Sequence, residues 1–169
     1  MTDASLYVDD IVTWADRQVA ELRRLAEAGV SNSVDWANVI EEIETVVRSE
    51  WLGVRSQLSN ALAHIIKGLV DPNSLSAEAW RLEVGRMLGD AREDYRPSMR
   101  VDLDMDEIWR RGFRHAAQSL ETYGAGVPPG IPNSCPFTLD DVLDPSFHYD
   151  QGRHRLRDIM LARASGEKQ

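Results

Sequence analysis

The fold is decided by residues 35–70, which read DWANVIEEIETVVRSEWLGVRSQLSNALAHIIKGLV. Apolar residues recur there in steps of three, four or seven, the spacing that keeps one face of an α-helix apolar. This stripe comprises Trp36, Ile40, Ile43, Val47, Val54, Leu58, Leu62, Ile65 and Leu69. The carboxylate of Asp35 can cap the first free amides. The stretch therefore predicts one long amphipathic helix, in which Gly53 permits a bend or break near the middle.

Three further helices are predicted by the same periodicity. The first covers residues 7–28 and ends at Gly29, and another runs from Ser76 to just before Pro97. The last carries apolar residues from Ile108 to Tyr123. The glycines at positions 85 and 89, one turn apart, are expected to let a neighbouring helix approach closely. Together these elements predict an all-α fold, an antiparallel four-helix bundle with a long second helix.

The C-terminal third is predicted to be less regular. Residues 124–136 hold three glycines and four prolines, which favour an extended segment that crosses the bundle surface. Thr138 and Asp141 form a capping-box pattern for a short helix over residues 139–143, which Pro145 ends. Asp71-Pro72-Asn73 is the predicted stop signal after the long helix. A short C-terminal helix over residues 153–164 has few apolar residues and is expected to be peripheral or frayed. We therefore predict a helical bundle domain at 1–150 and a basic C-terminal tail or peripheral helix at 151–169.

Composition limits the classes of function. With 169 residues the chain is long enough for one domain, and a single cysteine is typical of a reducing compartment. The first ten residues lack the pattern of a secretory signal, and no stretch is apolar enough to cross a bilayer, so we expect a cytoplasmic protein that does not bind membranes. The net charge of −9 opposes binding to nucleic acid. The charge is +3 over 151–169, where the basic tail can be solvated, lie on the acidic body or dock on an acidic partner.

Five polar residues of the long helix are the candidate binding residues: Glu41, Glu42, Glu44, Glu50 and His64. On a helical wheel Glu41 points away from the apolar stripe, whereas Glu42 and Glu44 lie on opposite flanks. His64 continues the flank of Glu42. Glu50 falls within the stripe, where a carboxylate is costly without a partner, so we expect it to pair with another helix or to have a raised pKa.

A metal centre is not favoured by the spacing of these residues. Along a helix, Glu50 lies about 21 Å and Glu42 about 33 Å from His64, so a straight helix cannot bring them to one ion. The Glu-x-x-His motif of metal-binding bundles is absent from the sequence. Cys135 lies between Ser134 and Pro136 with no histidine nearby, and a structural thiol is the favoured interpretation. We predict no metal ligand, no cofactor and no catalytic residue.

Several short motifs occur together in a characteristic order. They are Tyr7-x2-Asp10-x3-Trp14, Asp35-Trp36-x4-Glu41-Glu42-Ile43-Glu44, Leu62-x-His64-Ile65-Ile66-Lys67, Trp80, Tyr95-Arg96-Pro97 and Cys135-Pro136-Phe137. In this order and spacing the chain resembles the bacterial domain of unknown function 29 family over residues 6–147. The resemblance implies a small, cytosolic, all-α bacterial protein, and it draws attention to Glu41, Glu42, Glu44 and His64. Asn38, where a capping-box Glu is expected, and the basic segment after Tyr149 depart from the family pattern.

Two main hypotheses for function follow. The first is a non-enzymatic helical bundle that binds a protein partner or forms a homo-oligomer, through the polar edge of the long helix or through the Pro-rich segment. The alternative is an enzyme or a small-ligand or metal-binding bundle that uses Glu42, Glu50 and His64 in an interhelical cleft. The sequence does not identify a substrate, a partner or an oligomeric state.

Overall fold

The computed structural model describes residues 3–70 and 75–166, and within these ranges the fold is all-α, with no β-strand. The elements are α1 (Asp3–Asp9), α2 (Ile11–Glu27), α3 (Trp36–Val70), α4 (Leu75–Asp94), the 3-10 helix η1 (Pro97–Val101), α5 (Met105–Thr122), α6 (Leu139–Leu143) and α7 (Tyr149–Gly166). The long predicted helix is confirmed as α3, and Asp35 accepts a hydrogen bond from the backbone N–H of Asn38 (3.3 Å). The predicted stop signal at Asp71-Pro72-Asn73 lies outside the described residues.

The chain forms two compact units. The first comprises Met1–Gly53 and Asp94–Asp102, and the second comprises Val54–Glu93 and Leu103–Gln169. Helix α3 is continuous through Gly53, so this glycine does not break the helix, although the two units divide there. Residues 151–169 belong to the second unit, and the domain boundary after residue 150 stays a prediction.

The first unit begins with two helices where the sequence predicted one. Asp10 separates α1 from α2, and its carboxylate accepts hydrogen bonds from the Thr13 N–H (3.0 Å) and from the Ser98 hydroxyl of the segment that contains η1 (2.8 Å). The Tyr7 and Trp14 rings pack edge to face at 4.8 Å across this break. The single helix predicted over 7–28 is therefore wrong at Asp10, because the side chain satisfies the free amides of a new helix.

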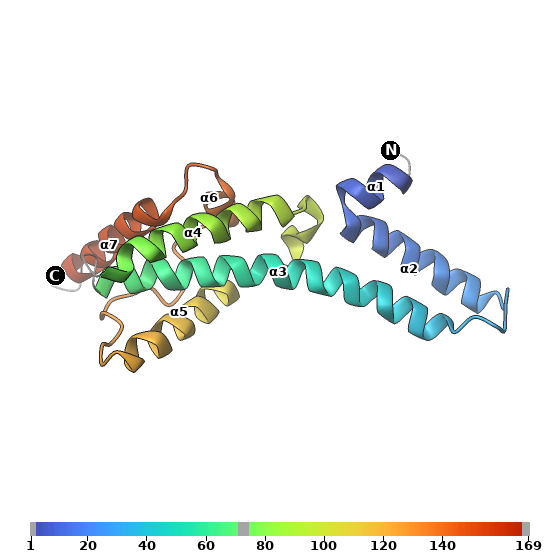
Figure 1. Ribbon diagram of the computed structural model, residues 1–169, viewed down its shortest axis with the longest axis horizontal. Helices are drawn as coiled ribbons and strands as arrows, with labels where there is room; N and C mark the ends of the chain where they lie inside the picture. Colours follow the sequence, from blue (N-terminus) through green and yellow to red (C-terminus); the bar gives the residue numbers. More distant parts are fainter. Residues whose placement is uncertain (1–2, 71–74, 167–169) are drawn as a thin grey trace. The chain divides into compact units, whose positions relative to one another are not determined.

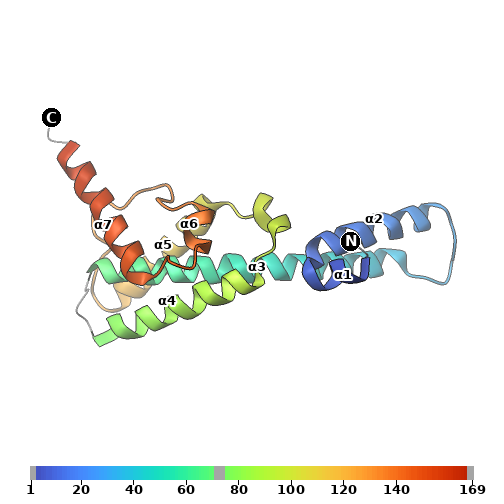
Figure 2. The ribbon, with the colours of Figure 1, turned by 90° about the horizontal axis from the view of Figure 1, so that it is seen from above.

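Helix α2 then runs back along the N-terminal half of α3 (Figures 1 and 2). Arg23 of α2 forms an ion pair with Glu44 of α3, and the indole N–H of Trp36 donates to the Ser31 carbonyl (2.9 Å). The buried apolar residues of this unit come from α1, α2 and η1: Leu6, Val12, Ala15, Val19 and Met99. None of the residues 20–53 is buried, so this helical hairpin has a thin core.

The core of the second unit surrounds the C-terminal half of α3, with α4, α5, α6 and α7 gathered around it (Figures 1 and 2). The α3 contribution consists of Val54, Leu58, Ala61, Leu62, Ala63, Ile65 and Ile66, each at most 5% exposed. Predicted inward positions of α4 and α5 are also buried, among them Val84, Leu88, Ile108 and Trp109. Tyr123, which was predicted to continue the α5 stripe, is instead exposed because it lies beyond the helix end.

Glycines allow close helix packing, but at positions that the sequence did not indicate. A Cβ on Gly112 of α5 would lie 2.6 Å from the Ser59 carbonyl oxygen of α3, so only glycine fits this crossing. A Cβ on Gly68 would overlap the hydroxyl of Tyr149. Gly85 and Gly89 are exposed with no atom near their added Cβ, so their predicted role in helix approach is wrong.

The irregular C-terminal third is confirmed in outline. Residues 123–138 contain no helix or strand, and α6 begins with the predicted capping box of Thr138 and Asp141. Helix α7 is less peripheral than expected, because Tyr149 and Leu156 are buried in its first two turns. Its basic side chains include Arg155, which forms an ion pair with Asp141 (2.9 Å) and so lies on an acidic part of the same unit.

Candidate functional site

The four candidate glutamates lie on the N-terminal half of α3 in the first unit. Glu41 and Glu42 are exposed, and Glu44 is partly exposed and pairs with Arg23. Glu50 is also partly exposed, and within residues 3–70 and 75–166 it makes no hydrogen bond or ion pair. The expected pairing of Glu50 is therefore not found among these residues.

His64 lies on the C-terminal half of α3 in the second unit, where it is half-buried. Its ring lies 6.5 Å from that of Trp80, and the ammonium group of Lys67 lies 5.2 Å from the same indole. Burial, and to a lesser extent the charge of Lys67, lower the pKa of His64 to about 4 against the opposing effect of Glu83. The imidazole is therefore neutral at pH 7, and its buried Nδ1 has no hydrogen-bond partner in the described part of the chain.

The structure does not gather these candidates around one hollow. None of them lines any of the three hollows described below. Among the described residues, no group of three or more His, Cys, Asp or Glu side chains is placed to hold a metal ion. The assignment of Glu41, Glu42, Glu44, Glu50 and His64 to binding stays a prediction.

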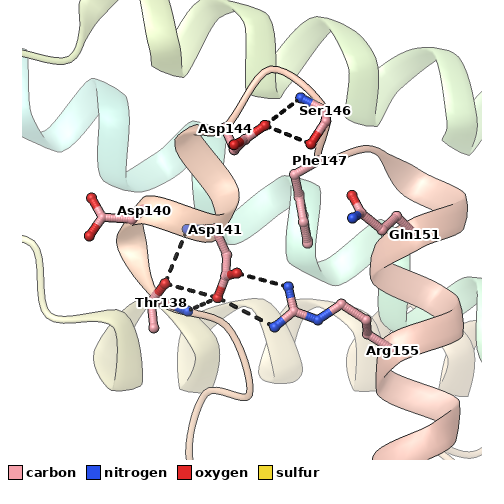
Figure 3. A pocket seen from close by; sticks show the side chains of 8 residues that line it. All are labelled: Thr138, Asp140, Asp141, Asp144, Ser146, Phe147, Gln151 and Arg155. Carbon is pink, nitrogen blue, oxygen red and sulfur yellow. Dashed lines mark hydrogen bonds and ion pairs between the residues drawn. The ribbon is translucent and has the colours of Figure 1, made fainter.

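One hollow of about 350 Å³ lies between α6 and the start of α7 (Figure 3). It is lined mainly by polar side chains: Thr138, Asp140, Asp141, Asp144, Ser146, Phe147, Gln151 and Arg155. Hydrogen bonds from Arg155 and Thr138 lower the pKa of Asp141 to about 2. The Asp144 carboxylate accepts hydrogen bonds from the N–H and hydroxyl of Ser146, which lower its pKa. These carboxylates thus serve the local fold.

Arg92 of α4 holds the chain around the end of α6 in place, a role that the sequence pattern did not indicate. Its guanidinium donates to the carbonyl oxygens of Val142 (3.1 Å), Leu143 (3.2 Å), Asp144 (2.8 Å) and Phe147 (2.8 Å). Val142 and Leu143 are the last two residues of α6, where a helix leaves its acceptors unsatisfied, and Asp144 and Phe147 follow it. Burial lowers the pKa of Arg92. An arginine in an amphipathic helix pattern cannot be distinguished from a solvated one by spacing alone.

A second hollow, also of about 350 Å³, lies between α5 and the Pro-rich segment. It is lined by Trp109, Arg110, Phe113, Arg114, Pro132 and Asn133. The indole N–H of buried Trp109 donates to the Pro132 carbonyl (2.8 Å), and Asp106 accepts a hydrogen bond from the Cys135 N–H (2.7 Å). These two bonds hold the Pro-rich segment against α5. The sequence analysis missed this hollow, although the basic run at residues 110–114 was a usable signal.

A third hollow of about 240 Å³ lies among α3, α4 and the end of α5. Its lining includes Lys67, Trp80, Leu120 and Tyr123. Burial lowers the pKa of Lys67. His64 does not line this hollow, although Lys67, three residues further along α3, does.

The surroundings of Cys135 agree with the prediction that its thiol is structural. It is partly exposed as a residue, and burial of its sulfur raises the pKa of the thiol to about 12. A thiol that stays protonated at pH 7 is a poor nucleophile. The residue therefore serves the attachment of the Pro-rich segment to α5.

Comparison with known proteins places this arrangement in a family. The family described as "Domain of unknown function DUF29" matches residues 6–148. The chain belongs to this family. A crystal structure of an alpha-helical protein of unknown function from Rhodospirillum rubrum, at 1.45 Å resolution, is similar, with 27% sequence identity and a TM-score of 0.82. The match covers 89% of this chain and 96% of that one.

The family match confirms the resemblance inferred from the motifs, and it leaves the biochemical role of the chain open. No curated protein matches the chain. None of the described helices is both long and apolar enough to cross a membrane.

Proposed function

We propose that this is a non-enzymatic, cytoplasmic interaction protein. In this proposal the scaffold is a four-helix bundle of α3, α4, α5 and α7, in which α7 takes the place of the helix that the sequence predicted over residues 7–28, and the α2–α3 hairpin binds a basic amphipathic helix of a protein partner. The observation that carries the proposal is that none of the residues 20–53 is buried, although the α3 stripe continues through them. An amphipathic helix in a folded protein normally buries its stripe against neighbours on more than one side.

The binding surface that we propose is one edge of the N-terminal half of α3, formed by Val39, Glu42, Val46 and Glu50. These residues are spaced by three or four positions, so they follow one another along the same side of the helix. Val39 is 41% exposed and Val46 is 46% exposed, and acidic residues lie next to both. We call this surface the valine edge. It offers apolar contact and negative charge together.

The charge of the hairpin indicates the chemistry of the partner. Residues 1–53 contain eleven acidic and four basic side chains, a net charge of −7, whereas the remaining residues carry −2. Repulsion between two such hairpins opposes self-association, and a basic helix is electrostatically complementary. A helix laid in a groove between two others with anchors at i, i+3 and i+7 is a common mode of recognition.

The enzyme alternative has less support. Glu42 and Glu50 lie on the partly exposed half of α3 and His64 on its buried half. Glu42 and Glu50 belong to the first unit and His64 to the second, and none of the three lines a described hollow.

The test uses a synthetic amphipathic helix of about 20 residues with lysine on its polar face and leucine on its apolar face. Fluorescence anisotropy would measure its binding to the full chain, with a companion peptide that has glutamate in place of lysine as the charge control. We expect the lysine peptide alone to bind, and binding to weaken as salt rises from about 50 to 500 mM. Val39→Ser combined with Val46→Ser should reduce the affinity about tenfold.

The matched control replaces Val8 and Val101, two other exposed valines of the first unit, by serine. This variant should bind like the parent. Equal binding of both peptides, or equal loss in both double variants, would contradict the proposal. A dimer seen by light scattering that strengthens with salt and is lost on substitution of the valine edge would show self-association instead.

A further inference from the structure

A different observation concerns the second hollow, between α5 and the Pro-rich segment. Its apolar lining comes from Trp109, Phe113 and Pro132. Trp109 is 1% exposed and donates a hydrogen bond to the Pro132 carbonyl, which holds its indole in place. Arg110 and Arg114 border the hollow from α5 and are exposed. They lie four residues apart and are therefore neighbours on the helix surface.

Neither arginine has an acidic partner among the described residues. Arg81, Arg86 and Arg155 of the same unit, by contrast, form ion pairs. The two carboxylates one turn before Arg110 are engaged elsewhere. Glu107 pairs with Arg55 of α3 (2.7 Å), and Asp106 accepts the Cys135 N–H.

Two free guanidinium groups beside an apolar hollow favour a ligand with an anionic group and an apolar body. Guanidinium groups bind phosphate and carboxylate oxygens through paired N–H donors. Flat rings pack well on aromatic and proline surfaces. A volume of about 350 Å³ is at the lower end of the range of small-molecule sites. The overall charge of −9 opposes a nucleic acid polymer but not a small anion.

We propose that this hollow binds a small organic anion in which a planar apolar ring carries a phosphate or carboxylate group. The ring lies against Phe113, and the anionic group contacts Arg110 and Arg114. This site is in the second unit and does not depend on the valine edge.

Isothermal titration calorimetry on the full chain tests the proposal with four probes: 1-naphthyl phosphate, 1-naphthoate, inorganic phosphate and 1-naphthol. The first two combine a ring with an anion and should bind saturably. Phosphate without the ring, and the ring without an anion, should each bind at least about tenfold more weakly. The ratio of the first two affinities identifies which anionic group the site prefers.

The variants Arg110→Gln and Arg114→Gln should each weaken the ring anions about tenfold. The matched control is Arg163→Gln, which removes another exposed arginine, on α7, that has no partner among the described residues. It should leave binding unchanged. Circular dichroism would confirm that the three variants keep the parent fold. Absence of saturable binding, equal binding of inorganic phosphate alone, or equal affinity in all variants would overturn the proposal.

Discussion

The two halves of α3 have the same apolar spacing but different surroundings. In the second unit Leu58, Leu62 and Ile65 are fully buried, whereas in the first unit Ile40 and Ile43 remain partly exposed. The difference arises from the number of neighbouring elements, since the N-terminal half packs mainly against α2 within its unit. An apolar stripe therefore indicates that a helix face can be buried. It does not indicate whether the covering residues belong to the same chain or to a partner.

The largest expected effect compares equivalent truncations in the two halves. Leu62→Ala should lower the free energy of unfolding of the second unit by about 3 kcal/mol, because it leaves a cavity in a closed core. Ile43→Ala should cost about 1 kcal/mol, because its side chain is already partly hydrated. Urea denaturation followed by circular dichroism would measure both. Equal losses would mean that the hairpin has a core as complete as that of the second unit.

The next effect concerns the close crossing of α3 and α5. Gly112→Ala should destabilise the second unit by about 2 kcal/mol, since the new methyl group must displace the Ser59 backbone. Gly85→Ala is the matched control on an exposed helix face and should stabilise by about 0.5 to 1 kcal/mol. Thermal unfolding would show opposite shifts in the midpoint. A loss at Gly85 or none at Gly112 would refute the packing described for this unit.

A comparable test applies to Arg92. Arg92→Gln should destabilise the second unit by about 1 to 3 kcal/mol, because carbonyl groups at the end of α6 and after it lose their donor. Arg86→Gln on the same helix removes two solvent-exposed ion pairs, with Glu83 and Asp90, and should have a much smaller effect. Chemical denaturation would compare the two variants. If Arg86→Gln were the more harmful, the role assigned to Arg92 would be wrong.

A further effect is a dependence of stability on pH, to which His64 and Asp141 of the second unit contribute. The folded pKa of His64, about 4, is below its usual 6.5, so the unfolded chain binds the proton more tightly. Stability should therefore be highest above pH 6.5 and fall as the pH decreases towards 4. Asp141, with a folded pKa of about 2, contributes stability above its usual pKa of 3.8, which is lost as the pH falls towards 2.

His64→Gln should reduce the change in stability between pH 6.5 and 4. The change in stability below pH 4, to which Asp141 contributes, should remain. Replacement of the exposed His154 by glutamine is the control and should change neither. Midpoints of thermal unfolding measured across this range would separate the two contributions. A His64 variant with the parent slope would mean that another group is responsible.

Local signals in the sequence predicted much of the fold. The stripe of α3, its Asp35 cap and the capping box of Thr138 and Asp141 all follow from interactions within a few residues. Periodicity also suggested that the glutamates of α3 differ in exposure, and Glu41 is indeed solvent-exposed.

The remaining features depend on partners distant in sequence. The break at Asp10 is stabilised by Ser98 as well as by Thr13, and the glycine at 112 matters only because α3 crosses there. Burial of Tyr149 depends on Gly68. The hollow beside Arg110 requires the fold to bring the Pro-rich segment back to α5. Spacing along a single helix carries no information about such contacts.

The contrast between the two halves of α3 is tested most directly by hydrogen exchange of its backbone amides in the intact protein. We predict that amides of residues 54–70 exchange at least about 100-fold more slowly than those of residues 37–53, because opening the second core costs more free energy. The lysine peptide should then slow exchange selectively in residues 37–53. Uniform protection along α3 in the free protein would contradict the account, since it would show that the hairpin is already complete without a partner.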